Sequence, residues 1–199
     1  MSVVIRGISK AEAEQRLDEI ADLRITIFRE FPYIYDGSIG YEVQYLSRYL
    51  RSKNAAFFGA FSADDKLVGV STCLPLAEEM IDIQKPFLVQ KIPIQKIFYF
   101  GESLLLPKYR GRGLGKSFFD LREKYALSFP EVEITTFCAV ERSDSHPLRP
   151  QGYRSLKEFW NARGYMKDED LTCQLEWKDI DQAQDTFKNL TFWIKSWSK

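Results

Sequence analysis

Apolar residues in the first fifty positions recur at helical spacing. Between Leu17 and Phe28 they fall every three or four residues, which predicts an amphipathic helix. Ser9 can cap this helix, and Pro32 marks its end. Apolar or aromatic residues at positions 41, 45, 46 and 49 also share one helical face, so a second helix is expected there.

From residue 55 onward, short β-rich runs alternate with helical patterns. Segments 55–61 and 67–74 flank a polar turn and predict a hairpin. Segment 97–106 is almost entirely apolar apart from Glu102, which is typical of a central strand buried on both faces. Segment 78–92, which contains Pro86, is predicted to form two short helices or an irregular lid. Further strands are expected at 2–7, 132–140, 171–178 and 187–195, and further helices at 114–125 and 155–163.

This mixture of patterns indicates an α/β or α+β fold. The 199 residues are enough for one domain, spanning 1–199, that buries its own core. With 45% hydrophobic and 28% charged residues, the composition is that of a folded globule. No internal repeat or low-complexity tract divides the chain.

The charge balance argues against several classes of partner. Lysine and arginine together number 28, as do aspartate and glutamate, so no global field attracts nucleic acid or an anionic membrane. Without a signal-like apolar run, a soluble cytoplasmic protein is expected. Three widely spaced cysteines predict reduced thiols, and the single histidine, His146, argues against a metal site.

A glycine-rich turn follows the expected strand 97–106 and precedes the helix at 114–125. Three glycines alternate in it with other residues, in the order Arg110, Gly111, Arg112, Gly113, Leu114, Gly115 and Lys116. Unpaired N–H groups at a helix start bind phosphate, and glycines allow its close approach. The basic side chains add charge-assisted hydrogen bonds worth about 1.5–3 kcal/mol each at best. The turn therefore predicts a diphosphate site.

The spacing excludes two other phosphate loops. The dinucleotide fingerprint requires G-x-G-x-x-G, whereas the glycines here stand at 111, 113 and 115. The nucleoside triphosphate loop requires a glycine five positions before Gly115, where this chain has Arg110. On the turn alone, a strand-to-helix connection with solvated basic residues stays open as the simpler interpretation.

Two segments resemble the GNAT N-acetyltransferase superfamily. Segment 107–115 is similar to its coenzyme A loop, Arg/Gln-x-x-Gly-x-Gly/Ala, through Arg110, Gly113 and Gly115. Segment 159–165, Phe-Trp-Asn-Ala-Arg-Gly-Tyr, resembles its late helix ending in aromatic-x-x-x-Gly-aromatic. The order of the expected elements also agrees, and the tract from Phe137 to Trp160 resembles a bacterial subgroup of unassigned substrate.

The resemblance implies a mixed, mostly antiparallel sheet of about seven strands with one splayed parallel pair, flanked by four or five helices. It implies acetyl-CoA as co-substrate, with its phosphates on the 110–116 turn. Its pantetheine arm would lie along the strand from Ser103 to Leu106, with Leu104, Leu105 and Leu106 as binding residues. A backbone N–H near Leu104 or Leu105 would polarise the acetyl carbonyl while an amine attacks it directly in a ternary complex.

Three residues are candidates for moving protons. Glu102 is the candidate base as the lone carboxylate of its strand, although it could instead face away and pair with an arginine. Strand alternation places Tyr99 opposite Glu102 unless a bulge intervenes, so one of the two should face the substrate. The superfamily often carries a tyrosine acid where this chain has Trp160, so Tyr153 and His146 are the alternative candidates. Each of them could also be a structural loop residue.

The resulting hypothesis is an N-acetyltransferase that acetylates a primary amine of a small molecule or protein. Nearby carboxylates could attract that amine, although such groups are more often simply solvated. They are Glu30, Asp36, Glu42, Glu78, Glu79 and Asp82. The alternative is a non-catalytic coenzyme A-binding module. The sequence leaves open the acceptor, the acyl chain length and whether the protein is a homodimer.

Overall fold

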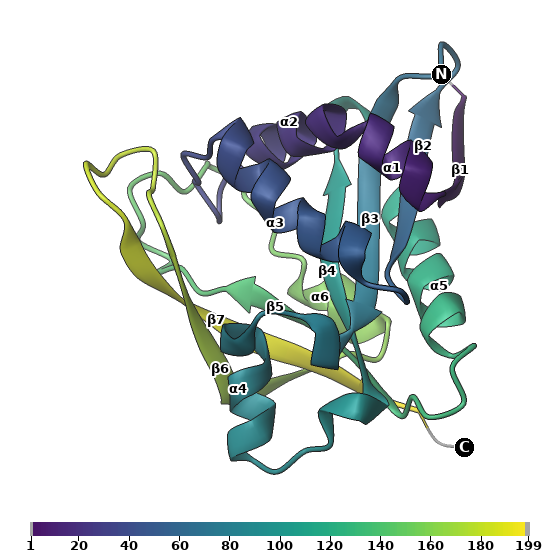
Figure 1. Ribbon diagram of the computed structural model, residues 1–199. Coiled ribbons are helices and arrows are strands. Elements are labelled where there is room, and N and C mark those ends of the chain that lie inside the picture. The colour runs from purple at the N-terminus through teal and green to yellow at the C-terminus, as the bar shows by residue number, and fades with distance from the viewer. Residues whose placement is uncertain (1, 198–199) are drawn as a thin grey trace.

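Seven strands form one sheet in the computed structural model, which describes residues 2–197 (Figure 1). The spatial order is β1-β2-β3-β4-β5-β7-β6, and only β4 and β5 run parallel. The mixed sheet with one parallel pair is therefore confirmed. The strands are β1 (Val3–Ile8), β2 (Ala56–Ser62), β3 (Leu67–Pro75), β4 (Ile97–Leu105), β5 (Ile134–Val140), β6 (Met166–Trp177) and β7 (Thr186–Ser196).

Six α-helices accompany the sheet within the described residues, more than the four or five expected. The predicted first helix is divided at Arg16, whose φ of −101° and ψ of 17° are not helical. Ser9 caps its first part, because the Ser9 hydroxyl accepts from Glu12 N at 3.2 Å. The helices are α1 (Lys10–Gln15), α2 (Leu17–Phe28), α3 (Ile39–Arg51), α4 (Ile81–Val89), α5 (Leu114–Ala126) and α6 (Lys157–Ala162).

Segment 78–92, predicted to form two short helices or an irregular lid, is mostly helical. A short 3₁₀ turn (Leu76–Glu78) precedes α4, and another (Ile94–Lys96) follows it. Pro86 lies inside α4. The apolar face of this helix is buried through Ile83 and Phe87. The Phe87 ring meets Phe192 of β7 edge-on, with ring centroids 4.8 Å apart, so packing holds this proline-containing helix against the sheet.

Two hydrophobic cores lie on opposite faces of the sheet. One core joins α2, α3 and α4 to the sheet through residues such as Ile20, Leu46 and Phe87. The other joins α5 to the opposite face through Phe118 and Phe119. None of the helices within residues 2–197 is long and apolar enough to span a membrane.

The parallel pair separates soon after it forms. Registered pairs join β4 to β5 only from Ile97 to Tyr99, although β4 continues to Leu105. On its other edge, β4 stays paired with β3, but the register shifts where Gly101 and Glu102 lie opposite Thr72. The sheet therefore opens beside the second half of β4, and a bulge lies at the opening.

Candidate active site

The glycine-rich turn forms the N-terminal end of α5. Gly111 and Gly113 have positive φ angles of 75° and 81°. Ser117 N donates to Gly113 O at 3.1 Å, so the N–H groups of the preceding residues have no partner within the helix. A Cβ built on Gly111, Gly113 or Gly115 would meet no heavy atom within 4 Å. The turn therefore offers N–H donors and open space to an anion.

At the end of β4, the backbone N–H and C=O of Leu105 point away from β3. Leu106 N donates to Val68 O at 3.0 Å, and the carbonyl of Leu104 lies against Gly69. Because backbone groups alternate between the two edges of a strand, the N–H and C=O of Leu105 point toward the side that β5 has left. Of the two predicted carbonyl-polarising N–H groups, only that of Leu105 faces the opening.

Arg110 links the turn to two other segments. Its Nε donates to Leu105 O at 2.8 Å, and its Nη atoms donate to both carboxylate oxygens of Glu30 at 2.7 and 3.2 Å. Both side chains of the ion pair are partly exposed. Arg112 donates to Lys108 O at 3.1 Å, and Lys116 is exposed. A bound diphosphate would therefore compete with Glu30 for Arg110.

A cavity of about 470 Å³ lies on the α2–α3 side of the opening. Among residues 2–197, its lining includes five carboxylates and one cation, Arg24. The carboxylates are Glu42, Asp82, Glu102, Glu176 and Asp185. The aromatic residues of the lining are Phe28, Tyr33, Tyr35, Tyr41, Tyr45, Tyr99, Trp177 and Phe187. This volume and these apolar walls are typical of a site for a small organic ligand.

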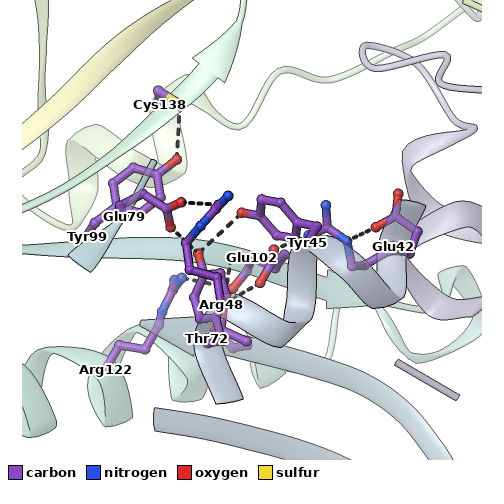
Figure 2. Close-up of polar contacts among 12 residues, drawn as sticks. Glu42, Tyr45, Arg48, Thr72, Glu79, Tyr99, Glu102, Arg122 and Cys138 are labelled. Carbon is purple, nitrogen blue, oxygen red and sulfur yellow. Dashed lines mark hydrogen bonds and ion pairs between the residues drawn. The ribbon is translucent and has the colours of Figure 1, made fainter. Parts of the chain in front are cut away.

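Glu102 lies in the floor of this cavity and also pairs with an arginine. Arg24 Nη1 and Thr72 Oγ1 donate to its two carboxylate oxygens, and Arg24 Nε donates to Glu42 (Figure 2). Burial by itself lowers the pKa of Arg24, but Glu102, Tyr45 and Glu42 together raise it above its ordinary value. Arg24 therefore stays charged between the two carboxylates.

The bulge brings Tyr99 to the same cavity as Glu102. Simple alternation predicted opposite faces, but the extra residue at Gly101 returns Glu102 to the face of Tyr99, and all three line the cavity. Tyr99 Oη lies 3.2 Å from Cys138 Sγ on β5 (Figure 2). Burial and then Cys138 raise the pKa of Tyr99, so its hydroxyl stays protonated.

A chain of hydroxyl groups leads from the cavity to a second buried carboxylate, Glu79. Tyr45 Oη lies 3.3 Å from Tyr49 Oη, and Tyr49 donates to Glu79 Oε2 at 2.9 Å (Figure 2). Arg48 Nη1 and Met80 N each donate to Glu79 Oε1 at 2.9 Å. Burial raises the pKa of Glu79, while the hydrogen bonds from Met80 and Tyr49 and the charge of Arg48 oppose that increase.

The other two predicted proton carriers lie together outside the cavity lining. Tyr153 meets Phe31 edge-on with ring centroids 4.8 Å apart, and His146 lies 5.8 Å from the same ring. His146 Nδ1 accepts from Leu148 N at 3.2 Å. Burial raises the pKa of Tyr153. Trp160 of α6 packs between aromatic rings of β5 and β7, with centroids 5.1 and 5.0 Å away.

Arg122 is a site residue that the sequence analysis missed. It is 2% exposed on α5, lies 4.5 Å from the rings of both Phe100 and Phe119, and donates through Nη1 to Glu102 O at 3.1 Å. Burial lowers its pKa to about 10. The signal was present, because position 122 is four residues after Phe118, on the apolar face of α5. Arg122 supports the backbone of the bulge from the face opposite the cavity.

Comparison with solved structures identifies the fold of this chain. No protein-family model matches the chain, and neither does any curated protein sequence. Arabidopsis thaliana NAA60 with a bisubstrate analogue aligns with a TM-score of 0.61 at 12% identity, covering 99% of this chain and 100% of that one. Ribosomal-protein-alanine N-acetyltransferase from Brucella melitensis aligns with a TM-score of 0.62 at 13% identity, covering 98% and 99%.

A third match was solved with coenzyme A. PaiA N-acetyltransferase from Thermoplasma acidophilum aligns with a TM-score of 0.56 at 14% identity, covering 99% of this chain and 100% of that one. Together with the seven-stranded sheet and its single parallel pair, these matches show that the chain has the GNAT acetyltransferase fold.

Proposed function

We propose that the chain is an acetyl-CoA-dependent N-acetyltransferase that acetylates a primary amine. The observation that carries this proposal is the arrangement along β4. Its open end presents the Leu105 N–H and leads into the glycine turn, while Tyr99 and Glu102 of the same strand line the cavity. One strand thus connects an anion site with a site for a small organic ligand.

The residues of the turn fit a pyrophosphate group. Gly111, Gly113 and Gly115 leave space that side chains would occupy, and the first N–H groups of α5 have no helical partner. Arg110, Arg112 and Lys116 supply positive charge beside those N–H groups. The acyl donor would bring an activated thioester to the opening next to Leu105.

The reaction then needs one bond exchange and two proton movements. The amine nitrogen forms a bond to the acetyl carbon, the carbon–sulfur bond breaks, and the Leu105 N–H stabilises the negative charge on the carbonyl oxygen. The amine loses a proton, for which Glu102 is the candidate acceptor within the cavity lining. The thiolate gains one, for which Tyr153 and His146 are the candidate donors.

A thiol-release assay with acetyl-CoA and a set of primary amines tests this function. We expect release of coenzyme A that depends on the amine, with a mass increase of one acetyl group in the product. Tight acetyl-CoA binding without release from any amine would instead support a non-catalytic coenzyme A-binding module. That second function is favoured by one observation, the packing of Trp160 among aromatic rings where a tyrosine acid was expected.

A further inference from the structure

The acceptor cavity has an excess of negative charge. Five carboxylates and one guanidinium belong to its lining. In the floor, Arg24 bridges Glu42 and Glu102, so three charged groups leave one net negative charge when both carboxylates are ionised. Charges held in a buried group interact more strongly with a ligand than solvated charges do.

One oxygen of this floor has no hydrogen-bond partner among residues 2–197. Glu42 is fully buried, and Arg24 donates to its Oε2, whereas Oε1 accepts nothing (Figure 2). Tyr35 lies beside Glu42 but forms no hydrogen bond to Oε1 that meets normal geometry. Burial, then the charge of Glu42 and the side-chain interaction with that carboxylate, raise the pKa of Tyr35. A buried carboxylate oxygen can only accept hydrogen bonds, so this position favours a ligand that donates them.

The rim adds a second negative region. Asp82 of α4, Glu176 of β6 and Asp185 before β7 are exposed and form no ion pair within the described part of the chain. Between the rim and the floor, the walls include Tyr33 and Trp177, whose rings lie 6.0 Å apart. The lining thus places negative charge at two levels, with aromatic surface between them.

We propose that the acceptor is an alkyl diamine or polyamine, an inference that rests on the proposed N-acetyltransferase function. One amine reaches the floor beside Glu42 and Glu102 and reacts, the methylene chain packs on the aromatic walls, and a second ammonium binds at the rim. An amino acid is disfavoured, because its carboxylate would face carboxylates that have no cation to share.

Three six-carbon amines with different distal groups test the proposal. They are 1,6-diaminohexane, hexylamine and 6-aminohexanoate. We expect kcat/KM for the diamine to exceed that for hexylamine about tenfold and that for 6-aminohexanoate by more, with the advantage shrinking as salt is added. Equal values for the diamine and hexylamine would overturn the proposal while leaving the N-acetyltransferase function intact.

A triple variant of the rim carboxylates tests where the second ammonium group binds. Removing the three rim charges together should raise KM for the diamine about tenfold and leave KM for hexylamine within about twofold. The rim variant is Asp82→Asn, Glu176→Gln and Asp185→Asn. The matched control removes three exposed charges outside the cavity, at Glu14→Gln, Asp18→Asn and Glu131→Gln, and should change neither value. Equal effects of both triple variants would contradict a rim site.

Binding measured by calorimetry without acetyl-CoA separates the two proposals. Tighter binding of 1,6-diaminohexane to the wild type than to the rim variant, with no turnover of any amine, would reject the enzyme function but support the cation site. Equal binding to both proteins would reject the cation site.

A second observation, the hydroxyl chain, concerns where the amine proton goes. Tyr49 has one hydroxyl proton and gives it to Glu79, so Tyr45 must be the donor in the contact between the two hydroxyls. This leaves the oxygen of Tyr45, a residue of the cavity lining, able to accept from a ligand N–H. Both oxygens of Glu102, in contrast, already accept hydrogen bonds from Arg24 and Thr72.

We infer that the amine proton leaves along Tyr45 and Tyr49 to Glu79. The N–H proton moves to Tyr45 Oη, the proton of Tyr45 moves to Tyr49 Oη, and the proton of Tyr49 moves to Glu79 Oε2. The groups facing Glu79 are Arg48 and Tyr49 of α3, the Met80 N–H, and Glu102 of β4 across the floor. Burial raises the pKa of Glu79, so the wild-type rate should fall as the pH drops through that raised value.

The pH dependence of kcat tests this route. Glu79→Gln and Tyr45→Phe should each lower kcat about ten- to a hundredfold near pH 7, and the loss should shrink toward pH 9.5 as more amine arrives unprotonated. Tyr125→Phe removes a partly buried hydroxyl outside the cavity lining and should keep the wild-type profile. Tyr49→Phe provides a second break in the chain if Glu79→Gln does not fold.

Glu102→Gln decides between the two carboxylates. If the loss of kcat in the variants of the Tyr45–Tyr49–Glu79 chain does not change with pH, these residues only support the cavity. If in addition the loss for Glu102→Gln shrinks with pH, Glu102 would be the proton acceptor and the inferred route would be wrong.

Discussion

Among single residues, Arg110 has a structural role in the turn and is also predicted to bind coenzyme A. It holds the end of β4 through Leu105 O and forms a two-point ion pair with Glu30. Such exposed ion pairs stabilise a fold by only about 0–1 kcal/mol, so a phosphate with more charge can displace the carboxylate. We therefore predict that Glu30 competes with coenzyme A for the Arg110 side chain.

Opposite effects of two substitutions test this competition. Arg110→Ala should weaken coenzyme A binding about ten- to a hundredfold, because a charge-assisted bond is lost. Glu30→Gln should strengthen binding about threefold, because the competing charge is removed. Isothermal titration measures both, with Arg51→Ala as an exposed control away from the turn. If both variants weakened binding equally, the ion pair itself would be what the turn needs.

Among the elements, α5 connects the anion site with the core. Gly113 precedes its first residue in a left-handed conformation, which aims the first N–H groups outward. On its buried side, Arg122 reaches through the core to the bulge of β4. The start of α5 is thus the proposed site for the acyl donor, and its middle supports the strand that lines the cavity.

Two glycine substitutions at the start of α5 test the effect of a positive φ angle separately from the effect of an added side chain. Gly113→Ala should lower the free energy of unfolding by about 1–2 kcal/mol, because φ is +81° there, and should also weaken coenzyme A binding. Gly115→Ala should preserve or increase stability by up to about 1 kcal/mol, because alanine favours helix and the added Cβ has open space. Chemical denaturation checks both. Equal stability of the two variants would contradict the strain assigned to Gly113.

In the whole molecule, the opening of the sheet lies between the glycine turn and the cavity. Up to Tyr99, β4 is paired on both edges, and beyond it only β3 remains as a partner. The hairpin of β6 and β7 extends away from the β1–β4 half of the sheet and bounds the cavity with Glu176 and Trp177 (Figure 1). In the proposed function, the acyl donor and the acceptor would approach β4 from different sides of this opening.

Long-range pairing explains where the sequence analysis fell short. Arg24 and Glu102 are 78 residues apart, and Tyr49 and Glu79 are 30 apart, so no local pattern could pair them. The side of β4 that Glu102 faces depends on a bulge, which a period of two cannot reveal. Glu79 was considered only as one of several carboxylates near a lid, because its burial depends on α3 packing over it.

The mixed sheet with its parallel pair was implied by the resemblance to the GNAT superfamily. The sequence by itself determined the alternation of helices and strands and the glycine turn at the start of α5. These follow from neighbouring residues, because periodicity, positive-φ glycines and the start of a helix are local properties of the chain. Only the tertiary structure decided which side chains share the cavity and which hydrogen bonds they form. Those contacts depend on the packing of α2, α3 and the β6–β7 hairpin around the open edge of β4, where residues distant in sequence exclude water together.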